Sequence, residues 1–381
     1  MPPPNTLRPL PALAPLLLAP LFLAPLTTAA IAATATPATP SAIAAATPAA
    51  ASTAAPKPIR FAAAKIWDAA PHCAFTDLLA FRGRHYCVFR ESVSHVPPKT
   101  GGGDGKIRVL ASTDGDAWRP LALVEKTGFD LRDAQLTITP AGRLMLLTSG
   151  SIYDRGALKG RQMFAAFSDA AGETFSAPQP LTLPAALRDG WLWRVAWHDG
   201  AAHGVVYQTP SQTSGGAAWL VKSADGLRYD IITRLDVTGQ PNETALEFSP
   251  DGTLRLFLRR AAKDAAGHAL LGRAAPPYTD WRWSDLGIRA GGPFLLTLPG
   301  GNTLLGSRDH TEGAPGTALF TLDSQDRAVR LLRLPSGGDT SYPGMSVVGD
   351  ELWVSYYSGH EKPRGQAAIY LAKIKHADLF P

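Results

Sequence analysis

The sequence predicts an all-β protein whose folded part is a six-bladed β-propeller. The main observation is a repeat: six glycines stand at predicted hairpin turns, and neighbouring turns are separated by 59, 58, 52, 49 and 48 residues. Repeats of this size, made from short strands, are typical of propeller blades. Because no segment keeps a helical period, a propeller is favoured over helical folds, and the near-constant spacing favours it over a β-sandwich. The turn glycines are Gly83, Gly142, Gly200, Gly252, Gly301 and Gly349.

Each repeat is expected to form an inner strand, a tight turn and a second strand. Strand character follows from alternation: Leu254, Leu256 and Leu258 point to one side, and Arg255 and Phe257 to the other. The glycines supply the backbone freedom that tight hairpins need. The predicted strand pairs are 74–79 with 86–90, 133–138 with 144–148, 193–197 with 204–207, 243–248 with 254–259, 293–298 with 303–308, and 342–348 with 352–357.

A second repeated element lies between the hairpins. Residues 112–118 and 223–229 share the pattern Ser-x-Asp-Gly-x-x-aromatic, and residues 168–175 are a longer relative. In such a turn the aspartate accepts hydrogen bonds from nearby backbone N–H groups, and the glycine takes the left-handed conformation. We therefore expect these turns to be structural, with no catalytic role.

The N-terminal part differs in composition from the rest. Residues 1–33 combine Arg8, an apolar run and small-residue cleavage sites, and are predicted to be a secretory signal peptide. Residues 34–58 are almost entirely Ala, Thr, Pro and Ser, which is typical of a linker. The propeller domain is expected over residues 59–381. The protein is expected to be secreted or periplasmic, with no membrane span after the signal is removed.

Composition limits the classes of partner. The formal net charge is +5, but charged residues make up only 18% of the chain and form no Lys/Arg runs, so nucleic-acid binding is not expected. The histidines and acids show no compact metal-ligand spacing, so no metal and no cofactor are expected, and the chain is expected to be a monomer. Cys73 and Cys87 flank the first turn, where simple register does not place them opposite each other. Two free thiols are therefore favoured over a disulfide.

A propeller brings the start of each inner strand, and the loop after each second strand, to one central mouth. Polar residues at these positions are therefore candidates for a common site, although they are spread over most of the chain. Glu247 lies on the same strand face as Glu243 and competes with it by alternation. The main candidates are Asp77, Arg90, Arg132, Asp133, Arg194, Glu243, Arg259, Arg308 and Tyr342.

Four of these residues resemble the site pattern of the sialidase family. Glu243, Arg259, Arg308 and Tyr342 follow in that order, with gaps of 16, 49 and 34 residues, and the resemblance covers about residues 65–375. The Ser-x-Asp-Gly turns likewise resemble the Asp-boxes of that family. The resemblance implies a sialidase-type six-bladed propeller, with Tyr342 as nucleophile and Glu243 as its base. It also implies that the two arginines clamp a sugar carboxylate in a fork that Lys cannot offer.

The chain departs from the family pattern in its first repeat. Sialidases carry an arginine of the carboxylate clamp in the first inner strand, but residues 74–77 here read Ala-Phe-Thr-Asp. Arg90, Arg132 and Arg194 are candidates to replace it, and Asp133 is a further substrate contact or a partner of Arg132. Asp77 is the first candidate for the acid/base, ahead of two residues of the following loop, Asp104 and His95.

Three functions follow from these residues. The first is an exported, exo-acting, sialidase-like glycoside hydrolase on an acidic sugar, with a glycan or glycoconjugate as substrate; a different acidic sugar or a neutral one stays open. The second is a polysaccharide lyase that uses the same pocket for β-elimination from a uronate. The third is a non-catalytic carbohydrate-binding propeller.

Overall fold

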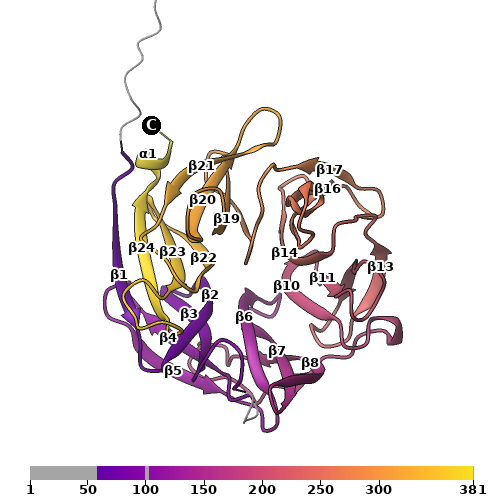
Figure 1. Ribbon diagram of the computed structural model, residues 1–381, viewed down its shortest axis with the longest axis horizontal. Coiled ribbons are helices and arrows are strands. Elements are labelled where there is room, and N and C mark those ends of the chain that lie inside the picture. Colours follow the sequence, from indigo (N-terminus) through magenta and orange to yellow (C-terminus); the bar gives the residue numbers. More distant parts are fainter. Residues whose placement is uncertain (1–57, 99–102, 381) are drawn as a thin grey trace, which may run out of the picture. The chain divides into compact units, whose positions relative to one another are not determined.

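The computed structural model describes residues 58–98 and 103–380. It confirms the predicted fold: six four-stranded antiparallel sheets surround a common centre as the blades of a propeller (Figure 1). The predicted signal peptide and nearly all of the predicted linker lie outside the described residues. Within the described part, no helix is long and apolar enough to cross a membrane.

The blades follow one another along the chain, and the inner strand of each comes first. The first three blades are β2 (His72–Phe81), β3 (Arg84–Ser92), β4 (Lys106–Ser112) and β5 (Arg119–Val124); β6 (Asp130–Ile138), β7 (Leu144–Asp154), β8 (Ala157–Phe167) and β9 (Gln179–Pro180); and β10 (Trp191–His198), β11 (Ala201–Gln208), β12 (Ala217–Ser223) and β13 (Asp230–Arg234).

The other three blades keep the same order, except that the last borrows its outer strand from the start of the chain. They are β14 (Pro241–Phe248), β15 (Leu254–Arg260), β16 (Leu270–Ala274) and β17 (Arg282–Asp285); β18 (Phe294–Thr297), β19 (Thr303–Asp309), β20 (Gly316–Leu322) and β21 (Ala328–Arg333); and β22 (Thr340–Val348), β23 (Glu351–Ser358), β24 (Ala368–Lys375) and β1 (Phe61–Trp67). The described helices are short: η1 (Ala185–Leu187), η2 (Ala265–Gly267) and α1 (His376–Leu379).

Strand β1 closes the ring, and sequence reasoning did not predict it. It pairs antiparallel with β24, from Phe61 opposite Ile374 to Trp67 opposite Ile369 (Figure 1). The segment Phe-Ala-Ala-Ala-Lys-Ile-Trp has neither a clear alternation nor a hairpin turn of its own, so nothing local marks it as a strand. Its position is determined by a partner more than 300 residues away in the sequence.

The predicted turns form as expected. All six turn glycines have positive φ angles, between 61° at Gly349 and 92° at Gly301. In the first Ser-x-Asp-Gly turn, the Ser112 hydroxyl accepts from the Gly115 N–H at 2.8 Å, and Asp114 accepts from the N–H groups of residues 116 and 117 at 2.8 and 2.9 Å. The turn at residues 223–229 repeats this arrangement.

The two cysteines are free thiols, as favoured from the sequence. Cys87 on β3 pairs with Leu78, whereas Cys73 on β2 pairs with Glu91, and both side chains are buried. Burial raises the pKa of the Cys73 thiol to about 12, so this group stays protonated and unreactive at neutral pH.

Five of the six inner strands carry a β-bulge at the same place. In each, two residues of the inner strand oppose one residue of the second strand, close to the start of the inner strand. Phe75, Asp133 and Tyr342 also have positive φ angles, of 62°, 51° and 51°. A bulge turns side chains away from simple alternation, so these positions can face the propeller centre. The bulged pairs are 75–76, 133–134, 193–194, 242–243 and 342–343.

The first and last blades are joined beside the centre by a buried hydroxyl pair. Thr76 donates to the Tyr342 carbonyl at 2.7 Å and accepts from the Ser355 hydroxyl at 3.0 Å. Both hydroxyl-bearing residues are almost fully buried. This contact therefore links β2 to β22 and β23 in addition to the closure by β1.

Replacing Thr76 by valine should lower the free energy of unfolding by about 1–3 kcal/mol, because the Ser355 hydroxyl and the Tyr342 carbonyl would stay buried without their partner. Urea denaturation of the full chain measures this change. Thr76→Ser keeps the hydroxyl and should lose clearly less. No loss in Thr76→Val together with a loss in Thr76→Ser would show that packing of the methyl group, and not the hydrogen bonds, matters at this site.

Candidate active site at the propeller centre

A tyrosine–glutamate pair occupies the centre of the candidate site. The Tyr342 hydroxyl donates to Glu243 Oε1 at 2.7 Å, and the Gly292 N–H donates to Oε2 of the same carboxylate at 2.8 Å. The two residues lie 99 positions apart, on bulges of β14 and β22. The structure thus brings together the two residues that the sequence proposed as nucleophile and base.

Local backbone geometry brings the tyrosine to this position. Gly292 has a φ of 60°, and a Cβ placed on it would lie 2.4 Å from the Tyr342 ring, so only glycine fits here. Burial, and then the negative charge of Glu243, raise the pKa of the Tyr342 phenol well above 10. The phenol is therefore protonated at neutral pH, and Glu243 is the group that can take its proton.

Arg259 and Arg308 flank this pair. Arg259 lies opposite the bulge of β14, and its Nη1 is 2.5 Å from Glu243 Oε1. Arg308 lies over the Tyr342 ring, with the guanidinium carbon 5.5 Å from the ring centre. Its Nε and Nη2 both donate to the Thr340 carbonyl, and Nη2 also donates to the Tyr357 hydroxyl at 3.1 Å. Both predicted clamp arginines therefore adjoin the tyrosine, and both already have partners.

The carboxyl group of Asp133 has a raised pKa and no hydrogen-bond partner among the described residues. Asp133 stands on the bulge of β6. Burial raises its pKa to about 7, while Arg132 opposes this shift and Glu243 adds to it. A carboxylic acid with a pKa near 7 is about half protonated at neutral pH and can donate a proton, which is the property a general acid needs.

Asp77, the acid/base favoured from the sequence, lies instead in a closed ion pair. It is 1% exposed. Its carboxylate accepts from Arg194 Nη2 at 3.1 Å and Nη1 at 3.2 Å, and from the Leu136 N–H at 2.8 Å. The Arg194 guanidinium also stacks on Phe294 at 4.3 Å. These contacts join β2, β6 and β10, so the geometry gives both residues a structural task and leaves Asp77 badly placed to reach a substrate.

Arg90 and Arg132 share a second buried acid, Asp130. Arg90 is fully buried, and its Nε and Nη2 donate to the two oxygens of Asp130 at 2.9 and 2.8 Å. Arg132 Nε lies 3.4 Å from Asp130, and its Nη2 donates to the His95 carbonyl. Arg132 also covers the Phe75 ring at 5.5 Å, so it borders the centre, whereas Arg90 does not reach it.

Glu247, the competitor of Glu243, pairs with Arg255 and the Thr297 N–H and makes no contact with Tyr342.

Sequence reasoning missed Asp339, which precedes Tyr342 by three residues. Its Oδ2 lies 2.8 Å from His72 Nε2 and 2.5 Å from His95 Nδ1, and its Oδ1 accepts from the Tyr357 hydroxyl at 2.8 Å. Burial opposes ionisation, but these hydrogen bonds outweigh it and hold the pKa of Asp339 well below its usual range. Asp339 is the last loop residue before the inner strand β22, and that position was the available signal.

Three of these groups form a compact set of possible metal ligands, which the sequence spacing did not predict. The ligand atoms of His72, His95 and Asp339 all lie within 4.8 Å of one another. At 2.8 and 2.5 Å, however, the imidazole nitrogens are at direct hydrogen-bond distance from the carboxylate. A tetrahedral ion with bonds of about 2.1 Å would hold its ligands farther apart, at roughly 3.4 Å. The three side chains therefore form a hydrogen-bonded cluster.

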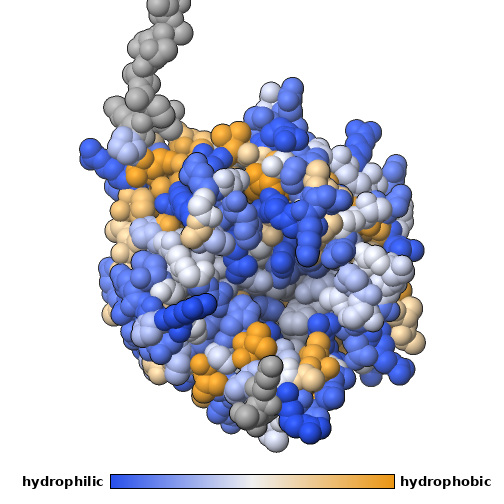
Figure 2. Space-filling model, viewed as in Figure 1, coloured by the Kyte–Doolittle hydropathy of each residue, from blue (hydrophilic) through white to orange (hydrophobic). Residues whose placement is uncertain are grey.

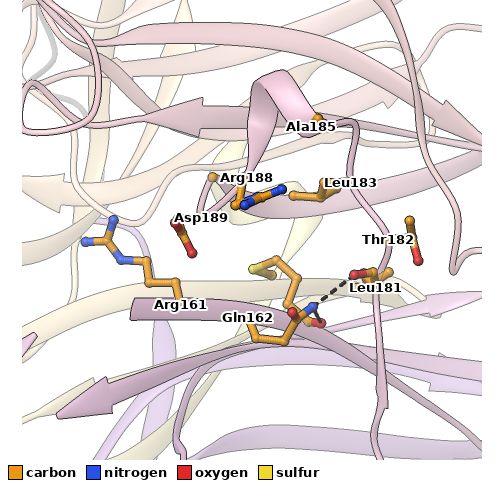
Figure 3. Close-up of a pocket in the computed structure, with 10 residues that line it drawn as sticks. Arg161, Gln162, Leu181, Thr182, Leu183, Ala185, Arg188 and Asp189 are labelled. Atoms are coloured by element: carbon orange, nitrogen blue, oxygen red, sulfur yellow. Dashed lines mark hydrogen bonds between the residues drawn. The ribbon is translucent and has the colours of Figure 1, made fainter. Parts of the chain in front are cut away.

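A side pocket of about 320 Å³ is lined by residues of β8 and of the segment that leads into β10. Figure 3 shows Arg161 and Gln162 of β8 facing Arg188 and Asp189, which follow η1. The Arg161 guanidinium lies 5.3 Å from the centre of the Trp191 ring, and the Trp191 ring stacks on the ring of Tyr207. No residue of the Tyr342–Glu243 centre lines this pocket. In the space-filling view, hydrophilic residues dominate the face shown, which is hollowed near its middle (Figure 2).

Comparison with solved structures extends the description of the fold. The chain matches a Dyadobacter fermentans protein of unknown function with a TM-score of 0.72 and 18% identity, over 84% of this chain and 99% of that one. It also matches Trypanosoma rangeli sialidase, with a TM-score of 0.60 and 11% identity over 81% of this chain and 56% of the sialidase. The fold is that of a sialidase-type propeller. The chain thus spans little more than half of the sialidase.

A second enzyme shares the architecture over its whole length. An α-L-arabinofuranosidase from Fusarium graminearum, solved as a variant with an iminosugar inhibitor, matches with a TM-score of 0.61 and 12% identity, over 82% of this chain and 95% of that one. No family model and no curated protein sequence matches the chain. At these identities the likeness establishes the fold alone.

Removing the Asp133 carboxyl should change how stability depends on pH. In the unfolded chain this group ionises near its ordinary pKa of 3.8, but in the folded protein only near 7. Raising the pH through this window therefore favours the unfolded state, and the cost is fully present above pH 7. The melting temperature of Asp133→Asn, relative to the unmodified protein, should increase from pH 4 to pH 7.5.

Thermal unfolding monitored by circular dichroism across that pH range makes the measurement. Asp133→Glu keeps a carboxyl group and should retain much of the original pH dependence. A constant difference between Asp133→Asn and the unmodified protein at all pH values would contradict the raised pKa.

Proposed function

We propose that the chain is an exo-acting glycoside hydrolase in which Tyr342 is the nucleophile and Glu243 its base. The observation that carries this proposal is the 2.7 Å hydrogen bond from the Tyr342 hydroxyl to Glu243, formed in the hollow where six blades meet. A phenol is a poor nucleophile until a neighbouring base removes its proton. Glu243 is held for this task by the Gly292 N–H and by Arg259.

The reaction proceeds in two steps on these residues. The Tyr342 oxygen attacks the anomeric carbon, its proton passes to Glu243, and the bond from the anomeric carbon to the leaving oxygen breaks. Asp133, whose pKa of about 7 leaves about half of its carboxyl protonated at neutral pH, donates a proton to that leaving oxygen. Water then attacks the anomeric carbon, gives its proton to Asp133, and releases the tyrosine, which recovers its own proton from Glu243.

Asp133 takes the acid role in this proposal because Asp77 is unavailable. The two oxygens of Asp77 are occupied by Arg194 and a backbone N–H. Asp133, by contrast, has a carboxyl without a partner among the described residues, and its charge interacts with those of both Glu243 and Tyr342. Nearness to the nucleophile and a pKa close to the working pH are the two properties that a general acid requires.

The structural neighbours support a carbohydrate substrate, and their printed activities define the first substrates to test. One neighbour is a sialidase, solved also with sialic acid, which is an acidic sugar. Another is an α-L-arabinofuranosidase, which acts on a neutral sugar. Arg259 and Arg308 were the basis for expecting an acidic sugar, and both lie within reach of a sugar bound at Tyr342.

Replacing Tyr342 by phenylalanine should lower kcat/KM by at least about a hundredfold on any glycoside that the protein cleaves, because the nucleophilic oxygen is lost. The full chain is assayed on 4-methylumbelliferyl glycosides of acidic and neutral sugars. Tyr229→Phe is the matched control, since this phenol is buried in the third blade and its hydroxyl has no hydrogen-bond partner among the described residues. Unchanged turnover in Tyr342→Phe would exclude the tyrosine mechanism.

Product analysis separates the hydrolase from its two rivals. A hydrolase releases a reducing sugar, whereas a lyase acting on a uronate polymer releases an unsaturated product that absorbs in the ultraviolet. A carbohydrate-binding propeller releases neither. Accumulation of an ultraviolet-absorbing product from polyuronate would contradict the proposed hydrolase and support β-elimination.

A further inference from the structure

Every arginine that the sequence offered for a carboxylate clamp already pairs with a carboxylate of this chain. Arg90 and Arg132 pair with Asp130, and Arg194 pairs with Asp77. The two at the centre are no exception. Arg259 lies 2.5 Å from Glu243, and Arg308 lies 4.0 Å from Asp339.

Asp339 is the carboxylate that adds negative charge next to Arg308 and Tyr357 at the propeller centre. It is 24% exposed at the side chain, so unlike Asp77 and Asp130 it reaches the open side of the site. His72, His95, Tyr357 and Arg308 surround it with hydrogen-bond donors or positive charge. A substrate carboxylate held by an arginine clamp needs surroundings of this kind. Here the protein supplies the carboxylate itself.

The inner strand of the first blade is arranged consistently with this. Phe75 stands on the bulge of β2, and its ring lies 5.1 Å from the rings of both Tyr342 and His95. An apolar ring adds no positive charge. Because His95 also contacts Asp339, the site presents aromatic surface close to an acid at this point.

The pairing of the arginines supports the same conclusion. The five arginines at the centre and in its surroundings each lie within 4.0 Å of one of four carboxylates, Asp77, Asp130, Glu243 and Asp339, whereas Asp133 forms no such pair within the described residues. An anionic sugar entering this set would meet like charge from Asp339 and Glu243 without an unpaired guanidinium to offset it. A neutral sugar would instead meet carboxylate acceptors for its hydroxyl groups and aromatic rings for its apolar face.

We infer that the site takes a neutral terminal sugar, and that Asp339 acts as a built-in counter-anion that excludes sugars with a carboxylate beside the scissile bond. The inference rests on the proposed hydrolase function for the identity of the scissile bond. The exclusion of anions by Asp339 is a property of binding and can be measured without turnover.

The binding test uses the carboxylate-bearing sialic acid analogue DANA as probe, with the full chain. Isothermal titration calorimetry compares the unmodified protein, Asp339→Asn and Asp326→Asn. Asp326 forms a two-point pair with Arg273 between the fourth and fifth blades, so its replacement removes the same charge away from the centre. We expect Asp339→Asn to bind DANA at least about tenfold more tightly than the unmodified protein, and Asp326→Asn to bind it like the unmodified protein.

Equal affinity of the unmodified protein and Asp339→Asn, including no detectable binding to either, would overturn the inference. The same holds if Asp326→Asn gains as much as Asp339→Asn, because the effect would then be one of net charge. Circular dichroism establishes that the variants fold, and Asp339→Ser replaces Asp339→Asn if the latter does not.

Hydrolysis distinguishes this inference from the proposed function. Cleavage of neutral 4-methylumbelliferyl glycosides, with no cleavage of the sialoside or the glucuronide, supports both. Faster cleavage of the sialoside than of any neutral glycoside upholds the hydrolase and overturns the neutral-sugar inference. If no glycoside is cleaved, the hydrolase proposal fails, and the comparison of DANA binding still decides whether Asp339 excludes anions.

Discussion

The β-bulge near the start of the inner strand is the constraint on which the candidate site depends. In five blades it interrupts alternation at the same place, and it turns Phe75, Asp133 and Tyr342 from sheet positions toward the centre. Each of these residues has a positive φ, which for residues other than glycine costs about 1–3 kcal/mol. Pairing and packing of the rest of each inner strand against its neighbours offset this free-energy cost.

The bulge also determines which residues meet across a hairpin. Arg259 is the single residue of β15 opposite the bulge that carries Glu243, and this explains why the two side chains touch. The buried ion pairs work over longer distances, as Asp77 and Arg194 connect three blades through one carboxylate. Removing one member of such a pair leaves an unpaired buried charge, so these residues are tied to stability as well as to the shape of the centre.

Much of the fold could be predicted from the sequence because its signals are local. Alternation and a turn glycine specify each hairpin within about 20 residues, and the Ser-x-Asp-Gly turns are specified within seven. The Tyr342–Glu243 pair was also found, since both residues stand near the start of an inner strand. In contrast, β1 and the partners of Asp77 and Arg90 could not be predicted, because no local pattern encodes which blade supplies the partner.

The general acid could not be predicted from the sequence for the same reason, because local sequence does not encode the partners of a carboxyl group. Asp77 and Asp133 occupy corresponding inner strands and look alike in the sequence. Asp133 is the first residue of its bulge, whereas Asp77 lies two residues beyond the first residue of its own bulge. Asp77 therefore forms a closed ion pair, and Asp133 has no partner in the described part of the chain. Asp339 was missed because it lies just before a strand, where loop residues are numerous and few take part in a site. Its importance follows from the two histidines that the first blade supplies.

The pairing of β1 with β24 has a consequence for the order of events at the ribosome. Phe61 is synthesised more than 300 residues before its partner Ile374, so the sixth sheet cannot be completed before β24 has been made. Until then β1 lacks its neighbour, and a free strand edge is a template for contacts with other chains. The Ala-Ala-Ala-Lys stretch of β1 is only weakly apolar, which suits a strand that stays unpaired until β24 is made.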